Sequence, residues 1–197
     1  MQYTIKTIAA ASQAEFSDKG SRFLAFAFPM DSVQTFKEEL QQLKNQHPKA
    51  VHHCFAYRLG TTKDNFRSSD DGEPSGTAGK PLLNQLDAFQ VTDAGIIVVR
   101  YFGGVLLGVP GLINAYKTSG AAALRAATVI EKPILATLKI NCDYNVLNDV
   151  MTIIKRQQFT IATKHIELFC RLEVQVPLHQ LESSKEQFEK IRSVVVE

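Results

Sequence analysis

Arg67-Ser68-Ser69-Asp70-Asp71-Gly72-Glu73-Pro74-Ser75-Gly76-Thr77-Ala78-Gly79-Lys80-Pro81 is the densest polar segment of the chain, and its pattern predicts a loop that ends on a helix start. Its three acids stand within four positions, from Asp70 to Glu73. The recurring glycines permit positive φ angles and close approach of the backbone to another group. Free N–H groups and the dipole of a helix start favour an anion, and Lys80 adds a charge in the first turn. The glycine spacing does not match a P-loop.

A second loop, Arg100–Gly111, follows a predicted buried strand, Gly95–Phe102, whose apolar residues do not alternate with polar ones. It leads into a predicted helix, Pro110–Thr128, with a face of mostly small residues. Arg100 and Tyr101 emerge at the strand end, where functional groups often sit in layered α/β structures. We expect the two loops to build one groove, in which Arg100 pairs with Asp70 or Asp71.

Hydrophobic periodicity predicts the remaining N-terminal elements. The apolar positions of Ser32–Gln46 fall on one face of a helix, and Asp31 or Ser32 is its expected cap. Residues 60–76 are expected to be a polar loop, followed by a helix over Thr77–Phe89. The expected strands are Tyr3–Ala9, Phe16–Ser17, Arg22–Phe28 and His52–Leu59.

A boundary is expected near Pro133, which cannot continue the preceding helix. Beyond it, strands over Leu135–Tyr144, Thr160–Ile166 and Leu168–Val176, a short strand at the C-terminus and two amphipathic helices give the order β-α-β-β-α-β. This is the order of the split βαβ sandwich, in which helices cover one sheet face and leave the other open. The sequence therefore predicts an α+β chain with two domains, residues 1–133 and 134–197.

Composition excludes several classes of protein. With 197 residues and 45% apolar residues the chain can bury a real core, and a net charge of +2 is low for a protein that holds nucleic acid by charge alone. Three dispersed cysteines predict neither a disulfide framework nor a zinc site. The first residues do not resemble a signal peptide, and no apolar run has the length of a membrane span. We expect a soluble, cytoplasmic protein.

The polar residues predict binding rather than catalysis. His52 and His53 are neighbours in a strand and point to opposite faces, so they cannot hold one metal together. No spacing supplies three metal ligands, so neither a metal nor a cofactor is expected. A hydrolytic reading needs a nucleophile such as Ser75 or Thr77 with a histidine as base, but no Gly-x-Ser-x-Gly elbow is present.

Three segments of the chain closely resemble the signature of the IMPACT family, in its YigZ-like bacterial branch. They are His52-His53-Cys54-Phe55-Ala56-Tyr57-Arg58, Ser69–Pro81 and Val99-Arg100-Tyr101-Phe102-Gly103-Gly104. Ser21-Arg22-Phe23 fits as well, and the resemblance is strong over residues 15–130. The C-terminal part is similar to the small extra domain of the bacterial branch.

The resemblance implies an N-terminal domain like the second domain of a small-subunit ribosomal protein, a βαβ sandwich. It implies a ferredoxin-like C-terminal domain similar to the late domains of elongation factor G. Eukaryotic members of the family regulate translation by competing for an activator of an initiation-factor kinase. For the bacterial branch, the common inference is binding to nucleic acid or the ribosome.

The chain departs from the family pattern after Gly104. The family usually reads Leu-Gly-x-Gly-Gly-Leu-x-Arg-Ala-Tyr at this point, whereas this chain has Pro110 in place of a glycine and Asn114 in place of the arginine. Pro110 removes one helix-start donor, and Asn114 removes a cation. Both changes weaken an anion site at this helix.

Together these features predict a translation-associated regulatory or binding protein whose partner is RNA, the ribosome or a translation factor. The alternative is an enzyme or small-ligand binder that acts on a phosphorylated ligand in the same groove. The predicted binding residues are Arg22, His52, His53, Arg67, Asp70, Asp71, Glu73, Ser75, Thr77, Lys80, Arg100, Tyr101, Gly103 and Gly104.

Overall fold

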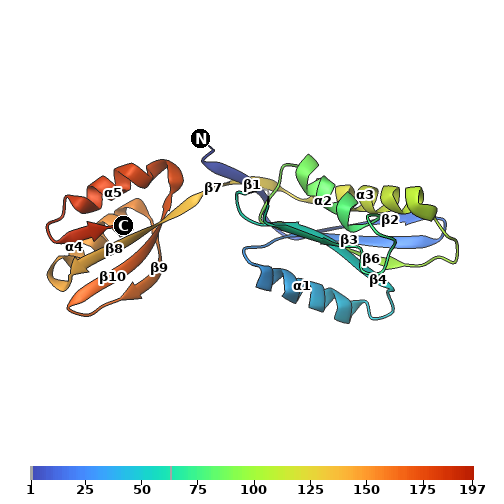
Figure 1. Cartoon of the computed structure of the whole chain (residues 1–197), viewed down its shortest axis with the longest axis horizontal. Coiled ribbons are helices and arrows are strands. Elements are labelled where there is room, and N and C mark those ends of the chain that lie inside the picture. Colours follow the sequence, from blue (N-terminus) through green and yellow to red (C-terminus); the bar gives the residue numbers. More distant parts are fainter. Residues whose placement is uncertain (1, 63) are drawn as a thin grey trace. The chain divides into compact units, whose positions relative to one another are not determined.

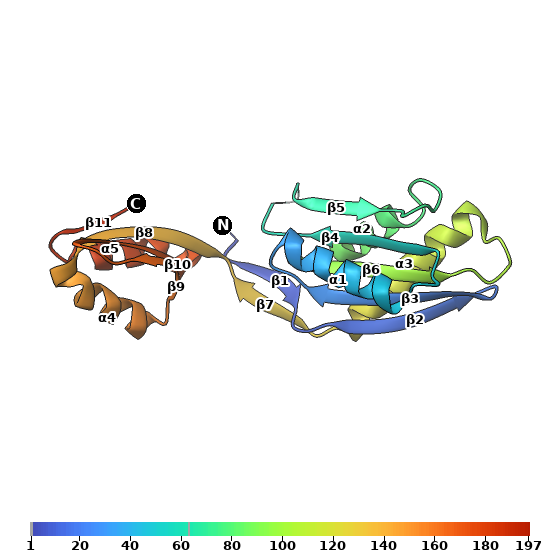
Figure 2. The ribbon, with the colours of Figure 1, turned by 90° about the horizontal axis from the view of Figure 1, so that it is seen from below.

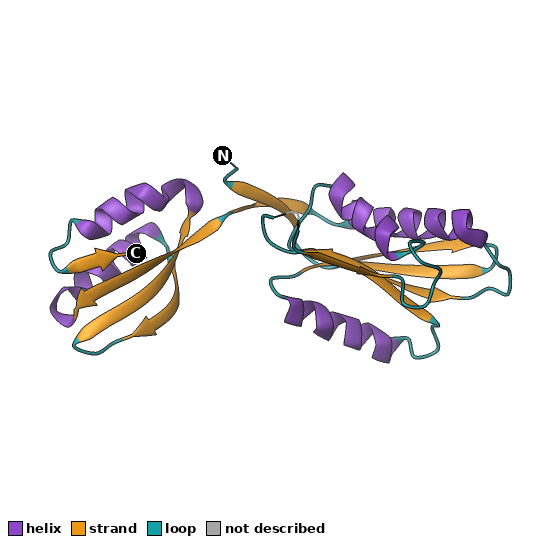
Figure 3. Cartoon of the chain, viewed as in Figure 1, coloured by secondary structure: helices purple, strands orange, loops and turns teal. Residues whose placement is uncertain are grey.

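The computed structural model describes residues 2–62 and 64–197, and it has an α+β fold (Figures 1 and 3). The chain divides into two compact units. One unit is Ile5–Lys132, and the other combines residues up to Thr4 with Pro133–Glu197. No helix within the two described ranges is long and apolar enough to cross a membrane.

The N-terminal unit is built on a five-stranded sheet with the order β2-β3-β6-β4-β5. Each neighbouring pair in this sheet is antiparallel. The strands are β2 (Ser12–Asp18), β3 (Ser21–Pro29), β4 (His52–Arg58), β5 (Phe66–Ser69) and β6 (Ala94–Tyr101). A separate two-stranded sheet pairs β1 (Thr4–Ile8) with β7 (Val129–Pro133).

Helices cover both faces of the five-stranded sheet, as Figures 1 and 2 show. The helices α2 (Gly79–Ala88) and α3 (Gly108–Ala126) lie on one face, and α1 (Val33–Gln46) lies on the other. The side chains of β6 alternate between the two cores: Ile96 and Val98 pack with α2 and α3, whereas Ile97 and Val99 pack on the α1 side. Burial on both faces explains why this strand is apolar without alternation, as predicted.

The C-terminal unit has the predicted β-α-β-β-α-β order. Its sheet has the strand order β11-β8-β10-β9, and two helices pack on one face. The alternating residues of β10 divide as expected, with Cys170, Leu172 and Val174 buried beneath the helices. The elements are β8 (Leu135–Asp143), α4 (Leu147–Gln157), β9 (Thr160–His165), β10 (Phe169–Pro177), α5 (Leu181–Glu189) and β11 (Val194–Val196). The ferredoxin-like arrangement of this unit is confirmed.

Several expected element bounds were wrong. Residues 60–76 are not wholly a loop, because Phe66–Ser69 form the edge strand β5, which pairs with β4. This strand is short and mostly polar, so it carries no hydrophobic period, and only pairing with β4 defines it. The helices also begin elsewhere than predicted, α2 at Gly79 instead of residue 77 and α3 at Gly108 instead of residue 110.

Gly103 lies at the closest approach between the β6–α3 loop and the β2–β3 turn. A Cβ at this position would lie 1.9 Å from the Gly20 carbonyl carbon and 2.2 Å from the Ser21 nitrogen. These neighbours are backbone atoms, which cannot turn aside as a flexible side chain does. The adjacent Gly104 has open space around it but a φ of +87°. Neighbouring glycines are thus required for different reasons, one steric and one conformational.

Gly103→Ala is expected to destabilise the N-terminal unit by about 3 kcal/mol, because overpacking against backbone forces the loop and the turn apart. Gly104→Ala is the matched control, and it should cost only about 1–2 kcal/mol for a left-handed conformation. Urea unfolding of both variants measures the difference. Equal losses of stability would show that the close approach to Gly20 is not a constraint.

Candidate functional site

Asp70 closes the N-terminal end of α2 from the loop that precedes it. Its carboxylate accepts the N–H groups of Gly76 at 2.9 Å, Ala78 at 2.9 Å and Gly79 at 2.8 Å. The residue at the N-cap position, Ala78, offers no side-chain acceptor, so Asp70 does the work of a cap. The anion that this helix start favours is therefore supplied by the chain itself.

The hydrogen bonds to Asp70 also determine its acidity. Partial burial raises the pKa of its carboxyl group, but the three backbone N–H donors outweigh burial and hold the pKa below its usual value. Asp70 is therefore a carboxylate in the folded protein at neutral pH, and its charge is bound to the backbone of its own loop.

Asp71 joins the same loop to β4 through the two histidines. The Asp71 carboxylate accepts the backbone N–H of His53 at 2.7 Å, and its carbonyl oxygen lies 2.7 Å from Nδ1 of His52. A carbonyl only accepts, so Nδ1 of His52 carries the proton. The two rings lie on opposite faces of the sheet, as predicted: His52 faces the loop, and burial lowers the pKa of His53 on the α1 side.

Glu73 is the centre of the site, with a side chain only 3% exposed. Its Oε1 lies 2.6 Å from Nη1 of Arg100 and accepts the hydroxyl of Tyr116 at 2.8 Å. The Nε2 of His52 is 3.9 Å from the same oxygen. The expected pairing of Arg100 with Asp70 or Asp71 is wrong, because those two carboxylates are bound to backbone N–H groups.

Arg100 connects both loops to the sheet. Its register partners are His52 on β4 and Phe23 on β3, so its guanidinium lies in the sheet row beneath the polar loop. The guanidinium carbon lies 5.4 Å from the Phe23 ring centre and 5.6 Å from that of Phe102, distances typical of cation–π contacts. The Oγ of Ser21 accepts two hydrogen bonds, one from Nη2 of Arg100 at 3.4 Å and one from the backbone N–H of Gly103 at 3.2 Å.

Cys54, Tyr116 and Ser21 also belong to this network, although they are not among the site residues predicted from the sequence. The Cys54 sulfur lies 2.9 Å from the carbonyl oxygen of Asp70 and 3.3 Å from the Tyr116 hydroxyl. Burial raises the pKa of the Cys54 thiol and of the Tyr116 phenol, so both stay protonated. The signal that could have identified them is their place in the family motifs. Cys54 follows His53, Tyr116 ends the motif that holds Asn114, and Ser21 precedes Arg22.

The remaining predicted residues divide between interior and surface. Thr77 is buried, and its hydroxyl donates to the carbonyl of Pro74 at 2.6 Å. The Tyr101 hydroxyl lies 3.0 Å from His47 Nδ1 on the α1 side. Arg22 is exposed and paired with Glu15 at 2.8 Å. The other exposed residues are Arg67, Ser75, Lys80, Gly103 and Gly104.

Among residues 2–62 and 64–197, no three His, Cys, Asp or Glu side chains are grouped so that they could hold a metal ion. The acids of the polar loop are instead bound to backbone N–H groups or to Arg100.

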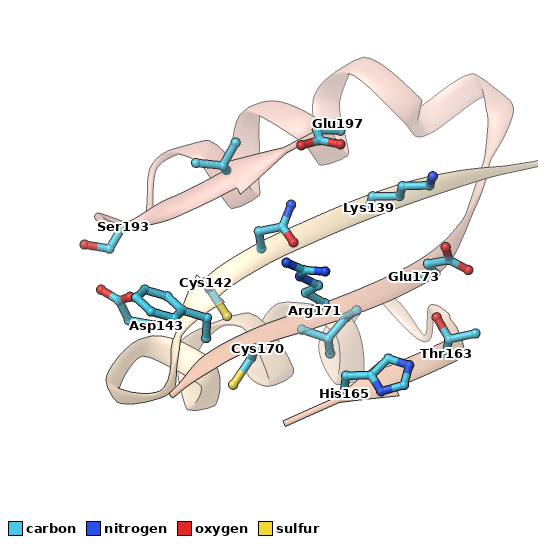
Figure 4. A pocket seen from close by; sticks show the side chains of 14 residues that line it. Lys139, Cys142, Asp143, Thr163, His165, Cys170, Arg171, Glu173, Ser193 and Glu197 are labelled. Carbon is cyan, nitrogen blue, oxygen red and sulfur yellow. The ribbon is translucent and has the colours of Figure 1, made fainter. Parts of the chain in front are cut away.

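The open face of the C-terminal sheet forms a separate hollow of about 880 Å³ (Figure 4). Arg171 lies at its centre, with Lys139 and His165 on neighbouring strands, and Glu173 lies beside Lys139 in the β8–β10 register. Asp143 and Glu197 also line the hollow. Its acids and cations are interspersed, so charge alone selects no class of ligand for this face.

Glu73→Gln is expected to destabilise the chain by about 3–5 kcal/mol, because it leaves the Arg100 guanidinium buried without a counter-charge. Adding Arg100→Met to this variant should recover much of the loss. Urea unfolding of the two single variants and the double variant gives the coupling energy. Glu15→Gln, which breaks the exposed pair with Arg22, is the control and should change stability little. A purely additive double variant would contradict the assigned pairing.

Asp70 gives the site a pH dependence of known sign. Its folded pKa lies below the unfolded value, so its contribution to stability is present above the unfolded pKa of about 3.9. That contribution is lost as the pH falls through the folded pKa. Stability measured between neutral pH and about pH 3 should therefore fall less steeply in Asp70→Asn than in the wild type. The same decrease of stability with falling pH in the two proteins would contradict this role of Asp70.

Comparison with known proteins identifies the family. A model of the Impact N-terminal domain matches residues 19–124. IMPACT family member YigZ of Escherichia coli (strain K12) is 37% identical over 161 residues, which are 81% of this chain and 79% of that protein. IMPACT family member YvyE of Bacillus subtilis (strain 168) is 34% identical over 165 residues, 84% of this chain and 76% of that protein.

The whole fold also has a solved counterpart. A crystal structure described as that of a hypothetical protein covers 100% of this chain and 97% of its own, with 31% identity and a TM-score of 0.86. The family match spans the loop, the strand and the helix that hold Glu73, Arg100 and Tyr116, so it covers the complete network. The chain belongs to the IMPACT family.

Proposed function

We propose that the chain is a translation-associated binding protein that contacts RNA, the ribosome or a translation factor through its two loops, Arg67–Pro81 and Arg100–Gly111. The observation that carries the proposal is the buried ion pair between Glu73 of the first loop and Arg100 of the second. It holds the two loops together as one preorganised surface, and preorganisation reduces the entropy lost on binding. The family resemblance supports the translation context, and a ribosomal partner implies activity in the cytoplasm.

The chemistry of the network favours binding over reaction. A nucleophile needs a lowered pKa or an adjacent base, and burial raises the pKa of the Cys54 thiol instead. The Thr77 hydroxyl donates to the carbonyl of Pro74, not to a histidine. The polar groups of the interior are thus used to hold the loops in place.

Arg67 on the edge strand β5 and Lys80 in the first turn of α2 are the exposed cations of the Arg67–Pro81 segment. Both are exposed, and neither has an ionic partner among the residues described by the structure. Arg100 contributes little to an anion site, because Glu73 neutralises it in the interior. Two cations give a weak electrostatic contribution, which matches the low net charge of +2.

The test is a charge reversal, Arg67→Glu with Lys80→Glu, in the full chain. Wild-type protein should co-sediment with purified bacterial ribosomes, and the double variant should not. With a short single-stranded RNA, each phosphate contact contributes about 0.7 to the salt slope of the affinity, so the wild-type slope should be about 1.4 and that of the variant near zero.

The matched control is Lys37→Glu with Lys49→Glu, which makes the same change in net charge. Both lysines are exposed, one on α1 and one in the loop between α1 and β4. Equal loss of ribosome association in both double variants would show that the net charge of the protein, and not the position of Arg67 and Lys80, causes the loss. Association that survives reversal of Arg67 and Lys80, or tight binding of a nucleotide instead of RNA and ribosomes, would overturn the proposal.

A further inference from the structure

The β6–α3 loop, which is part of the surface in the proposed function, and the start of α3 carry a group of exposed apolar side chains. We call this cluster the apolar tip; it consists of Phe102, Val105, Leu106, Val109 and Ile113. These side chains are 38% to 84% exposed, and Leu106 is the most exposed of them. Single exposed apolar residues are ordinary, but a contiguous exposed cluster marks an interaction surface.

Buried residues within the same stretch of chain keep the side chains of the tip exposed. Leu107 and Leu112 are buried in the core beneath α3, so the chain is anchored on both sides of Val109. Gly104 and Gly108 have positive φ angles, which turn the loop between these anchors. The exposure of the tip therefore follows from the packing of its neighbours and does not depend on a frayed segment.

The border of the tip is positively charged. Lys117 lies one helical turn beyond Ile113 on the same face of α3, and Lys19 lies in the β2–β3 turn, whose Gly20 packs against Gly103. Both lysines are exposed, and neither has an ionic partner within the described ranges. Asp18, in the same turn as Lys19, is half-buried and carries the opposite charge, so the two lysines exceed the acids of this border by one charge.

We propose that the apolar tip docks an acidic segment of a protein partner that is rich in apolar residues. The apolar side chains of that segment pack on Leu106 and Val109, and its carboxylates face Lys19 and Lys117. Four of the five tip residues are aliphatic and offer neither hydrogen bonds to base edges nor stacking platforms, so the tip is poorly suited to RNA. The tip lies largely in the Arg100–Gly111 loop of the proposed function, but it shares no residue with the cations Arg67 and Lys80, so the peptide assay and the ribosome assay can fail separately.

The test selects peptides from a random display library on the immobilised full chain. Enriched sequences are expected to combine apolar and acidic residues. A synthetic copy of one of them should bind Val105→Ser with Leu106→Ser at least roughly tenfold more weakly than wild type in fluorescence anisotropy, because tip residues carry the contact. The control is Leu168→Ser, since Leu168 is also 84% exposed but lies in the other unit.

Charge reversal tests the border separately. Selection on Lys19→Glu with Lys117→Glu should no longer enrich acidic peptides, while the apolar content of the enriched peptides persists. Enrichment of basic peptides by the wild type, or equal peptide binding by the tip variant, would overturn the proposal. It would also be overturned if the tip mediates self-association, seen as a dimer by light scattering that is lost in the tip variant, or if the tip inserts into anionic phosphatidylserine vesicles.

Discussion

The buried ion pair between the Glu73 carboxylate and the Arg100 guanidinium is the interaction on which the site depends. A buried charge is tolerated only when an opposite charge and hydrogen bonds replace the water that it loses. Arg100 and Tyr116 supply these, and they come from β6 and α3. A carboxylate from one loop, a cation at a strand end and a hydroxyl on a helix must therefore meet at one point, which fixes how the two loops lie on the sheet.

The same requirement explains why so many polar residues of the loop face inward. Asp70 completes the start of α2, and Asp71 ties the loop to β4 through His53. Asp70 accepts backbone N–H groups of its own loop and of the helix start, and Asp71 accepts one from β4, so both carboxylates satisfy buried backbone donors. The segment that looks most reactive in the sequence is thus largely a structural clamp, and its exposed cations are Arg67 and Lys80.

Placement of β6 in the middle of the sheet gives this clamp a rigid base. The strand is buried on both faces, so Arg100 emerges from the best-packed part of the N-terminal unit. Packing also explains the tight contact of Gly103 with Gly20, which closes the β2–β3 turn against the second loop. Polar network and apolar core support each other, because neither loop could hold its position without the strand beneath it.

The sequence by itself determined most of the element types, the α+β class and the family. Hydrophobic periods of two or 3.6 residues are local signals, and the polar and glycine-rich signature is a property of the residues alone. The sequence also predicted that the His52 and His53 side chains point to opposite faces of the sheet, because neighbouring residues of a strand always do so. The sequence did not predict the polar edge strand β5, because a strand without a hydrophobic period is defined only by its pairing with β4.

Only the tertiary structure decided which acid pairs with Arg100. Three carboxylates stand within four positions, and local chemistry does not distinguish them. The choice of Glu73 follows from long-range pairing of β4 with β6, which brings Arg100 beside His52, and from the packing of α3, which brings Tyr116 to the same carboxylate. Cys54 and Ser21 entered the network for the same reason, because contacts between residues far apart in the chain leave no periodic trace in the sequence.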